Sequence, residues 1–475
     1  MEAKESVVDV AVLGAGTAGL AAYRAAIARG KRALLIEGGP YGTTCARVGC
    51  MPSKLLIAAA DVAHTARDAA LFGVDATVSV DGRRVMDRVK RERDRFVGFV
   101  KDSVDAIAAG DKRSGTARFV APGTLDVALE GGGREVVRAT AVVVATGSEP
   151  VVPSLFDSIR DRLIVNDDVF AWETLPESAA VFGGGVIGLE LGQALARLGV
   201  RVRVYGRGGA VGPLTDPAVA ASAKEALGRE FSFDAAARIT RVDPDGAAGV
   251  RVTTQEAEGA ISRTFAVALI AAGRRPRLRG LDLEKSGATL ANGVPTVDEG
   301  TLQSGGSTVF FAGDVSGIRP LLHEAADEGR IAGDNAARYP AVVPHARRSP
   351  LAITFTDPNL AIAGESHRAL LARGATFVVG AIDFADQGRS RILDKNRGRG
   401  HLYFDATTAT FLGAELAHAR AEHMAHLLAW AHQSRLTAST MLAMPFYHPV
   451  VEEGLRSALR DADSKLRERA KRRSL

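Results

Sequence analysis

Cysteine is almost absent from this chain: only two of the 475 residues are cysteines, and both lie within residues 42–54. A chain that restricts its thiols to one pair keeps them away from every other place where they could react. The pair itself is therefore the candidate reagent.

Long apolar segments are also lacking. No run of 18 apolar residues occurs, and residues 1–6 (MEAKES) carry no apolar signal segment. We therefore expect a cytoplasmic protein without a membrane partner. The hydrophobic content of 46% over this length is enough for about three domains with real cores.

Excess charge is confined to the C-terminal tail. The net charge is +5, and residues 456–473, with eight basic and three acidic residues, account for all of it. The two aromatic residues nearest the tail, Phe446 and Tyr447, precede it, and the rest of the chain is neutral overall. Because a nucleic-acid-binding domain needs a basic face on its folded body, we expect no nucleic-acid partner.

The cysteine segment reads Gly42-Thr43-Thr44-Cys45-Ala46-Arg47-Val48-Gly49-Cys50-Met51-Pro52-Ser53-Lys54. One turn of helix would bring Cys45 and Cys50 to one side, within the roughly 5.5–6 Å between Cα atoms that a disulfide needs. Gly49 removes a Cβ where the crossing is tight, and Pro52 can start the following helix. Two structural thiols or a stabilising bridge remain open as alternatives. A disulfide that closes so short a loop constrains the unfolded chain only slightly and therefore stabilises the fold little, which favours a redox role.

A nucleotide-binding pattern occupies the start of the chain. The apolar run at residues 7–13 ends at Gly14-Ala15-Gly16-Thr17-Ala18-Gly19, a helical stretch follows to residue 29, and a strand at 33–36 ends in Glu37. Such glycines let backbone N–H groups approach a pyrophosphate at a helix N-terminus, and Glu37 can accept hydrogen bonds from a ribose. This βαβ unit predicts a dinucleotide site.

The same unit occurs a second time. A strand at 180–182 leads into a glycine motif at residues 183–188, a helix to 198 and a strand at 200–205. Two dinucleotide sites in one chain indicate that electrons pass between FAD and NAD(P)H. Gly206 and Arg207 follow the second strand, where an NAD site would have an acid. An Arg there would pair with a 2′-phosphate, which favours NADPH.

Three further segments carry chemistry-bearing residues. A buried strand at 141–145 ends in Thr146 and Gly147, a strand at 308–311 leads to Asp314, and His448 precedes Glu453 by five residues. Taken alone, Asp314 is equally a turn or helix cap, and His448 a core side chain. Three histidines at 423–432 share a helix expected at 420–434, but no cysteine lies near, so we expect no metal.

These motifs, in this order, resemble the class I pyridine nucleotide-disulfide oxidoreductases, the flavin-dependent family that includes dihydrolipoamide dehydrogenase and glutathione reductase. The family usually reads G-G-T-C-x-N-x-G-C-x-P-S-K, where this chain has Thr43 and Arg47 at the second Gly and the Asn. Its end motif H-x-H-P-T-x-x-E has Phe446 and Val450 as departures here. The resemblance implies a glutathione reductase-like α/β fold: two Rossmann-like dinucleotide-binding domains and a C-terminal α+β dimerisation domain. The implied segments are 1–150 and 276–346 for FAD, 151–275 for NAD(P), and 347–475 for dimerisation.

The resemblance also implies a role for each matching residue. Cys50 would lie next to the flavin ring, Cys45 would exchange with the substrate disulfide, and the partner subunit's His448, oriented by Glu453, would shuttle the proton. Lys54 and Glu190 would pair near the flavin and meet the nicotinamide. The implied FAD-binding residues are Gly14, Gly16, Gly19, Glu37, Thr44, Lys54, Thr146, Gly147 and Asp314, and the implied NAD(P)-binding residues are Gly183, Gly185, Gly188, Glu190, Arg207 and Gly273.

Within the family, Gly188 and the C-terminal motif favour an enzyme like dihydrolipoamide dehydrogenase, which acts as a homodimer on a small disulfide or a lipoyl-bearing protein. Arg207 keeps open an NADPH-dependent reductase of glutathione or another low-molecular-weight disulfide. A soluble transhydrogenase and an inactive flavoprotein scaffold are further alternatives. Mercuric and large thioredoxin reductases are disfavoured because this chain has no second cysteine pair.

Overall fold

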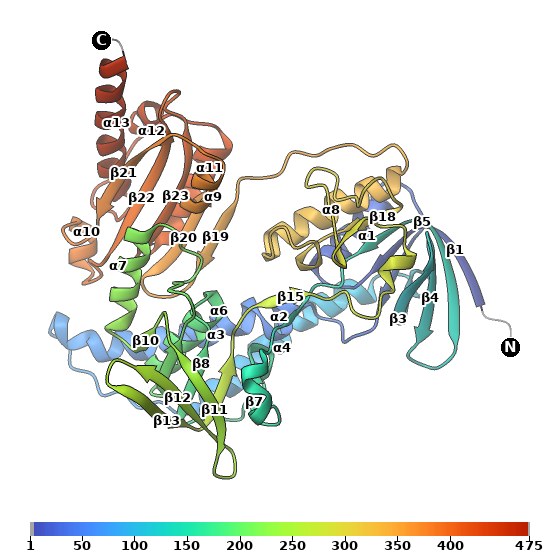
Figure 1. The fold of residues 1–475 in the computed structure, drawn as a ribbon, viewed down its shortest axis with the longest axis horizontal. Coiled ribbons are helices and arrows are strands. Elements are labelled where there is room, and N and C mark those ends of the chain that lie inside the picture. Colours follow the sequence, from blue (N-terminus) through green and yellow to red (C-terminus); the bar gives the residue numbers. More distant parts are fainter. Residues whose placement is uncertain (1–3, 474–475) are drawn as a thin grey trace. The chain divides into compact units, whose positions relative to one another are not determined.

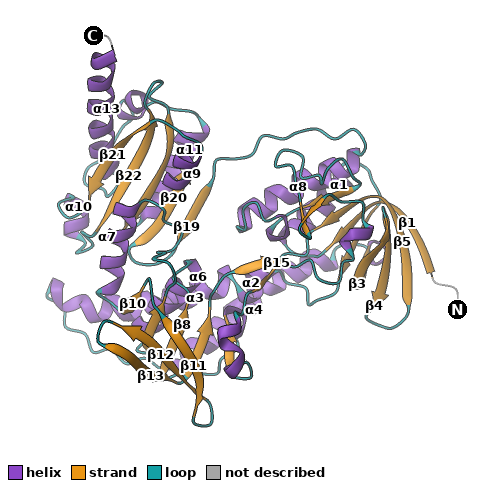
Figure 2. Ribbon diagram, viewed as in Figure 1, coloured by secondary structure: helices purple, strands orange, loops and turns teal. Residues whose placement is uncertain are grey.

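The structure is a computed structural model that describes residues 4–473. The chain divides into two units, each of which is drawn in Figures 1 and 2 and described here by itself. Unit 1 comprises residues 1–52, 88–151 and 273–347, and unit 2 comprises 53–87, 152–272 and 348–475. The four-segment division by function stays a prediction. Within residues 4–473, no helix combines the length and the apolar character that crossing a membrane requires.

Unit 1 is built around a six-stranded sheet. Its strands are β1 (Lys4–Leu13), β2 (Ala33–Glu37), β3 (Lys112–Ala121), β4 (Thr124–Leu129), β5 (Arg134–Val144) and β18 (Val309–Phe311). β1 pairs in parallel with β2 and β5, and β18 pairs in parallel with β5. β4 runs antiparallel to β3 and β5. The continuous apolar runs expected of buried parallel strands are confirmed, because residues 10–13 and 141–144 are fully buried.

Two helices of unit 1, α1 (Thr17–Ala28) and α8 (Leu322–Arg338), pack directly against each other (Figure 1). A Cβ atom at Gly329 would lie 2.1 Å from the Ala18 carbonyl oxygen, and one at Gly333 would lie 2.2 Å from that of Ala22. Only glycine therefore permits this helix crossing. The contact fixes the N-terminal turn of α1, which carries the first glycine motif.

Unit 1 has further elements outside the six-stranded sheet and the α1–α8 pair. They are α2 (Thr44–Val48), the short pairs β6 (Ser148–Pro150) with β15 (Arg274–Pro276) and β16 (Leu290–Ala291) with β17 (Val294–Pro295), and the larger part of α4 (Gly82–Asp105). The helix expected after residue 54 is α3 (Cys50–Arg67), followed by a 3₁₀ turn at Asp68–Phe72.

The first part of unit 2 is a five-stranded parallel sheet in the order β10-β9-β8-β14-β7. Its strands are β7 (Leu163–Val165), β8 (Ser178–Phe182), β9 (Arg201–Tyr205), β10 (Ser232–Asp234) and β14 (Val267–Ile270), with helices α5 (Asn166–Val169), α6 (Val186–Arg197) and α7 (Pro217–Gly228). β8, α6 and β9 are the second βαβ unit predicted from the sequence. An antiparallel sheet of β11 (Ile239–Asp245), β12 (Gly249–Glu256) and β13 (Gly259–Phe265) was not predicted.

The second part of unit 2 is an antiparallel five-stranded sheet in the order β19-β20-β23-β22-β21. Its strands are β19 (Leu351–Thr354), β20 (Asn359–Gly364), β21 (Phe377–Asp383), β22 (Gly398–Asp405) and β23 (Phe411–His418). Its helices are α9 (His367–Ala372), α10 (Gly388–Ile392), α11 (Ala421–Gln433), α12 (Ala438–Leu442) and α13 (Glu453–Arg473). Met424 and Leu428 of α11 are fully buried in its core. The antiparallel α+β arrangement predicted for this part of the chain is therefore confirmed.

Buried polar contacts join the two parts of unit 2 at the start of α7. The Glu415 carboxylate accepts hydrogen bonds from the backbone N–H groups of Thr215 and Asp216, at 2.7 and 2.8 Å. Asp216 caps α7 and also contacts His401 Nδ1 at 2.8 Å and the Tyr403 hydroxyl at 3.0 Å. Burial alone would raise the pKa of Asp216, but these hydrogen bonds and the His401 charge lower it overall.

Candidate functional site

The two cysteines lie where two helices meet in unit 1. Cys45 is in α2, Cys50 is the first residue of α3, and Gly49 separates the helices. The expectation that one helical turn aligns the thiols is therefore wrong, because the chain bends at Gly49 instead. A Cβ atom at Gly49 would lie 3.1 Å from the Thr44 carbonyl oxygen and 3.2 Å from Cys45 Cα, so a side chain there would crowd this bend.

The thiols face each other closely enough to interact. Hydrogen bonding with Cys50, together with burial of the half-buried thiol, raises the pKa of Cys45. The two thiols therefore form a hydrogen-bonded pair. This arrangement suits a dithiol that closes to a disulfide when it is oxidised.

Both departures from the family motif belong to this turn. Thr43 has φ 57° and ψ 152°, a region that favours glycine, and its hydroxyl accepts a hydrogen bond from the Ala46 N–H at 3.2 Å. The aliphatic stem of Arg47 and the side chain of Val97 in α4 both lie about 3 Å from the position of a Cβ at Gly42. Arg47 therefore packs against the turn with its stem, while Thr44 is exposed.

The first glycine motif has the shape that a dinucleotide requires. A Cβ at Gly14 would lie 2.4 Å from the Ala145 carbonyl oxygen, and one at Gly19 would lie 1.8 Å from the Gly14 oxygen, whereas nothing lies within 4 Å of a Cβ at Gly16. The outer glycines thus allow the tight turn, and the middle one leaves open space at the N-terminus of α1. That space is where a pyrophosphate would meet backbone N–H groups, so the residues fit FAD.

Glu37 lies at the end of β2, as predicted, and its carboxylate is already engaged. It accepts hydrogen bonds from the N–H groups of Ala15 and Gly39, both at 2.7 Å. Glu37 therefore braces the glycine turn as well as offering an acceptor at the strand end. The sequence pattern placed the acid correctly but did not predict this bracing.

The segments around Asp314 and Thr146 also come together in unit 1. Asp314 accepts a hydrogen bond from the Ser148 hydroxyl at 2.6 Å, and the Thr146 hydroxyl donates to the Arg277 carbonyl oxygen at 2.7 Å. Gly147 has φ 71°, and its carbonyl oxygen accepts from the Arg277 N–H at 2.9 Å. Gly273 has φ 114° and lies in the same unit.

Glu328 organises the Asp314 loop and was missed by the sequence reasoning. Fully buried in α8, it accepts hydrogen bonds from the Gly313 N–H at 2.8 Å, the Ser316 hydroxyl at 3.0 Å and Arg347 at 2.8 Å. Burial raises the pKa of Glu328, and these partners offset only part of that rise. The signal available in the sequence was an acid within the helical stretch that follows the Gly-Asp segment.

The second glycine motif, in unit 2, repeats the geometry of the first. A Cβ at Gly183 would lie 2.1 Å from the Ala271 carbonyl oxygen, and one at Gly188 would lie 1.9 Å from the Gly183 oxygen. Again nothing lies within 4 Å of a Cβ at the middle glycine, Gly185. The N-terminus of α6 therefore fits a second dinucleotide, NAD(P)H.

No acidic residue directly follows strand β9 at residues 206 and 207. A Cβ at Gly206 would lie 2.7 Å from the Ala235 carbonyl oxygen, so a larger side chain does not fit there. Arg207, the next residue, is exposed. The first side chain beyond β9 is thus cationic.

Lys54 and Glu190 meet within unit 2, as predicted. The Lys54 ammonium lies 2.7 Å from Glu190 Oε2, and Glu190 Oε1 accepts a hydrogen bond from the Phe355 N–H at 2.8 Å. Glu190 is buried in α6, while Lys54 is partly exposed. A buried carboxylate with a partner on each oxygen is held in one place.

A network of ion pairs lies further along the same helices and was not foreseen. The buried Arg197 guanidinium contacts Asp61 at 2.7 Å, Glu230 at 2.7 Å and Asp357 at 3.0 Å. His64, Glu230 and Asp357 have ligand atoms within 4.8 Å of one another, but the Arg197 cation occupies the same cluster. The group therefore forms an ion-pair network between α3, α6 and the segment after β19.

His448 and Glu453 form a pair in unit 2. His448 Nδ1 lies 3.0 and 3.1 Å from the two carboxylate oxygens of Glu453, and the imidazole is 80% exposed. Because Nδ1–H donates to the carboxylate, Nε2 is left as the acceptor that faces solvent. The dithiol belongs to unit 1 and this pair to unit 2.

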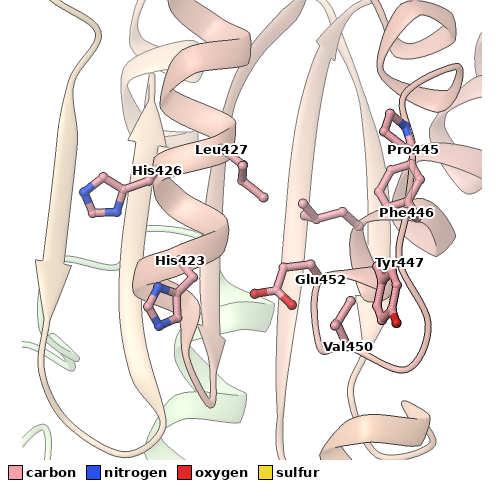
Figure 3. Close-up of a pocket in the computed structure, with 9 residues that line it drawn as sticks. His423, His426, Leu427, Pro445, Phe446, Tyr447, Val450 and Glu452 are labelled. Carbon is pink, nitrogen blue, oxygen red and sulfur yellow. The ribbon is translucent and has the colours of Figure 1, made fainter.

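A cavity of about 610 Å³ is lined by residues of α11 and of segment 445–455, the segment that also carries His448 and Glu453 in the sequence (Figure 3). It is formed by α11 on one side and by the loop that carries His448 on the other. Its lining is mostly apolar, with Leu427, Phe446, Tyr447 and Val450, and His423, His426 and Glu452 supply polar groups.

Comparisons with known proteins match nearly the whole chain. Residues 8–329 match the model of the pyridine nucleotide-disulphide oxidoreductases, and residues 351–459 match the dimerisation domain of the same proteins. The chain is 32% identical over 465 residues to dihydrolipoyl dehydrogenase 2 of Haloarcula marismortui, covering 95% of each protein. It is 26% identical to the dihydrolipoyl dehydrogenase of Bacillus subtilis, covering 95% of this chain and 97% of that protein.

Solved structures agree on the fold. LpdA from Mycobacterium tuberculosis superposes with a TM-score of 0.80 at 24% identity, covering 96% of this chain and 99% of that one. The HOCl-induced flavoprotein disulfide reductase RclA from Escherichia coli gives a TM-score of 0.77 at 23% identity over the same shares. The glutathione reductase-like fold class predicted from the sequence is thereby confirmed. The chain belongs to the pyridine nucleotide-disulphide oxidoreductase family, and it is a homodimeric, FAD-dependent disulfide oxidoreductase that uses NAD(P)H.

Proposed function

We propose that this enzyme passes electrons between NAD(P)H, FAD and the Cys45–Cys50 dithiol to a substrate disulfide, as a dihydrolipoamide dehydrogenase does. The observation that carries the proposal is the thiol pair at the α2–α3 junction, whose two thiols are hydrogen-bonded to each other. The names of the similar proteins from Haloarcula marismortui and Bacillus subtilis support the choice of substrate.

The dithiol would perform two exchanges. The Cys45 thiolate attacks one sulfur of the substrate disulfide, forming a mixed disulfide and releasing the first substrate thiolate. The Cys50 thiolate then attacks the Cys45 sulfur, which releases the second substrate thiolate and closes the Cys45–Cys50 disulfide. The reverse order oxidises a dithiol substrate.

The proton would be carried by the partner subunit's His448. Glu453 binds Nδ1–H and keeps Nε2 available, so the imidazole can give a proton to each leaving thiolate or take one from each incoming thiol. The homodimer would then be required for activity, because the dithiol and its base come from different chains.

Bound FAD would supply two-electron exchange between the nicotinamide and the dithiol. In our proposal it is held by Gly14, Gly16, Gly19, Glu37, Thr44, Lys54, Thr146, Gly147 and Asp314. NAD(P)H is held by Gly183, Gly185, Gly188, Glu190, Arg207 and Gly273. The matching segments are 1–150 and 276–346 for FAD, 151–275 for NAD(P) and 347–475 for dimerisation, and a cytoplasmic location stays a prediction.

An NADPH-dependent reductase of glutathione or another small disulfide is the second candidate. The observation that favours it is the strand end after β9, where Gly206 leaves no room for an acid and Arg207 is exposed. An arginine there pairs with a 2′-phosphate. A transhydrogenase and an inactive scaffold have no comparable observation in their favour.

Steady-state assays of purified holoenzyme test the proposal, with lipoamide and glutathione disulfide as substrates and NADH and NADPH as donors. We expect turnover of lipoamide, and we expect the C45S and C50S variants to lose it by at least about 1,000-fold, because neither exchange can be completed. Turnover of glutathione disulfide with NADPH alone would select the second candidate. Hydride exchange between nucleotides that survives in C45S, without disulfide turnover, would indicate a transhydrogenase.

A further inference from the structure

The segment after β19 lies along α6 in unit 2. Glu190 accepts the Phe355 N–H at 2.8 Å, and one turn later Gln193 accepts the Asp357 N–H and donates to the Asp357 carbonyl oxygen, both at 2.8 Å. Two turns after Glu190, Arg197 donates to the Asp357 carboxylate at 3.0 Å. Two buried side chains of α6 therefore hold the backbone of residues 355 and 357, and a third, Arg197, holds the Asp357 carboxylate.

Phe355 contacts both members of the Lys54–Glu190 ion pair. Its N–H binds Glu190 Oε1, while Lys54 binds the other oxygen, Oε2, at 2.7 Å. The Lys54 ammonium also lies 4.7 Å from the centroid of the Phe355 ring. This distance is within the range of a cation–π interaction, which attracts the ammonium to the ring.

The exposure of Phe355 argues against a simple core role. Its ring is 37% exposed, whereas the neighbouring Thr354 and Thr356 are 0% and 1% exposed. The chain thus buries two polar residues and leaves the aromatic ring between them at the surface, over the ammonium.

We propose that Phe355 is a positioning residue for the Lys54–Glu190 pair: its N–H fixes the carboxylate, and its ring holds the ammonium in place. This inference rests on the proposed role of the pair beside the nicotinamide. It adds a third residue, from the C-terminal part of unit 2, to the Lys54 and Glu190 side chains that are proposed to lie beside the nicotinamide.

The test compares F355L, which keeps apolar volume without a π face, with F355Y, which keeps the ring. The amine of Lys54 is labelled with acetic anhydride in flavin-containing protein without nucleotide, at several pH values, and measured by mass spectrometry. The Phe355 ring lies over the amine, so we expect F355L to uncover the amine and to raise its labelling at a fixed pH about five-fold. F355Y should match the parent protein.

A kinetic measurement separates positioning from packing. Anaerobic stopped-flow reduction by NADPH and NADH should slow about five-fold in F355L, with an unchanged Kd for NADP⁺ and NAD⁺ and unchanged flavin content. The control F99L removes another partly exposed ring that lies 5.9 Å from a cation, Arg95, on α4. We expect it to change neither measurement.

The outcomes are distinct. Unchanged Lys54 labelling and reduction rate in F355L, with only a lower unfolding temperature, would overturn the positioning role. If K54M also reduces at the parent rate, then the proposed function of the Lys54–Glu190 pair is wrong, whatever F355L does. Slow reduction in K54M with a parent-like F355L rejects this inference alone.

Discussion

At the scale of single residues, Thr43 carries a conformational cost next to the redox pair. Its φ of 57° with ψ of 152° is a region that residues with a Cβ rarely adopt, at a cost of about 1–3 kcal/mol. Its hydroxyl offsets part of this free-energy cost because it caps α2 by accepting a hydrogen bond from the Ala46 N–H. Glycine in the cap position forgoes only a few tenths of a kcal/mol.

We therefore expect T43G to raise the free energy of unfolding by about 1 kcal/mol, because it removes the strain and loses little at the cap. T43A keeps the strained Cβ and loses the cap, so it should lower that free energy by about 1 kcal/mol. Urea unfolding of matched holoenzymes measures both. Equal effects of the two substitutions would mean that the backbone at residue 43 is not strained.

At the scale of elements, strand β23 ends in a histidine with an unusual environment. His418 is 0% exposed, stacks on Phe384 with 4.0 Å between ring centroids, and contacts the Ala419 carbonyl oxygen through Nδ1 at 2.5 Å. Its Nε2 has no hydrogen-bond partner among residues 4–473. Burial lowers the pKa of His418 to about 3, against a partial rise from the Ala419 bond.

The folded-state pKa lies below the value of about 6.5 in the unfolded chain, so the unfolded state binds the proton first as the pH falls. The stability that His418 contributes is present above pH 6.5 and is lost towards pH 3. Between pH 6.5 and 5 we expect a loss of about 2 kcal/mol. H418L should remove this part of the pH dependence, as measured by urea unfolding at pH 7 and 5. The same pH dependence in both proteins would contradict the assignment.

Helices α3 and α6 show why the sequence predicted part of the site and missed the rest. Lys54 and Asp61, seven residues apart on α3, pair with Glu190 and Arg197, seven residues apart on α6. The glycine motifs, the cysteine pair and the His–Glu spacing are local patterns, and the sequence placed them correctly. The Asp61–Arg197 pair depends on two helices separated by more than 100 residues in the chain, so no local period indicates it.

At the scale of the whole molecule, the fold class was predictable because two βαβ units with glycine turns leave few alternatives. The sheet β11–β13 was missed, although its strands are seven or eight residues long and carry alternating polar residues, such as Arg251 and Arg263, that are typical of a half-buried strand. Residues 53–87 lie in unit 2, where Lys54 and Asp61 of α3 pair with Glu190 and Arg197 of α6.

The proposed sharing of one active site between two chains makes a prediction that single variants cannot test. C45S lacks the exchanging thiol but keeps a normal base, and H448Q lacks the base but keeps a normal dithiol. Each homodimer of these variants has two defective sites and should be nearly inactive. In a C45S/H448Q heterodimer, the dithiol of the H448Q chain would meet the imidazole of the C45S chain, so one of the two sites would be intact.

We therefore expect the purified heterodimer, isolated with two different affinity tags after co-expression, to show about half of the parent disulfide turnover per dimer. If the base came from the same chain as the dithiol, neither site of the heterodimer would be complete, and its activity would stay at the level of the two homodimers. A C45S/H448Q double variant paired with the parent chain is the control. Under the shared-site arrangement it has no intact site, whereas a same-chain base would leave the parent site working.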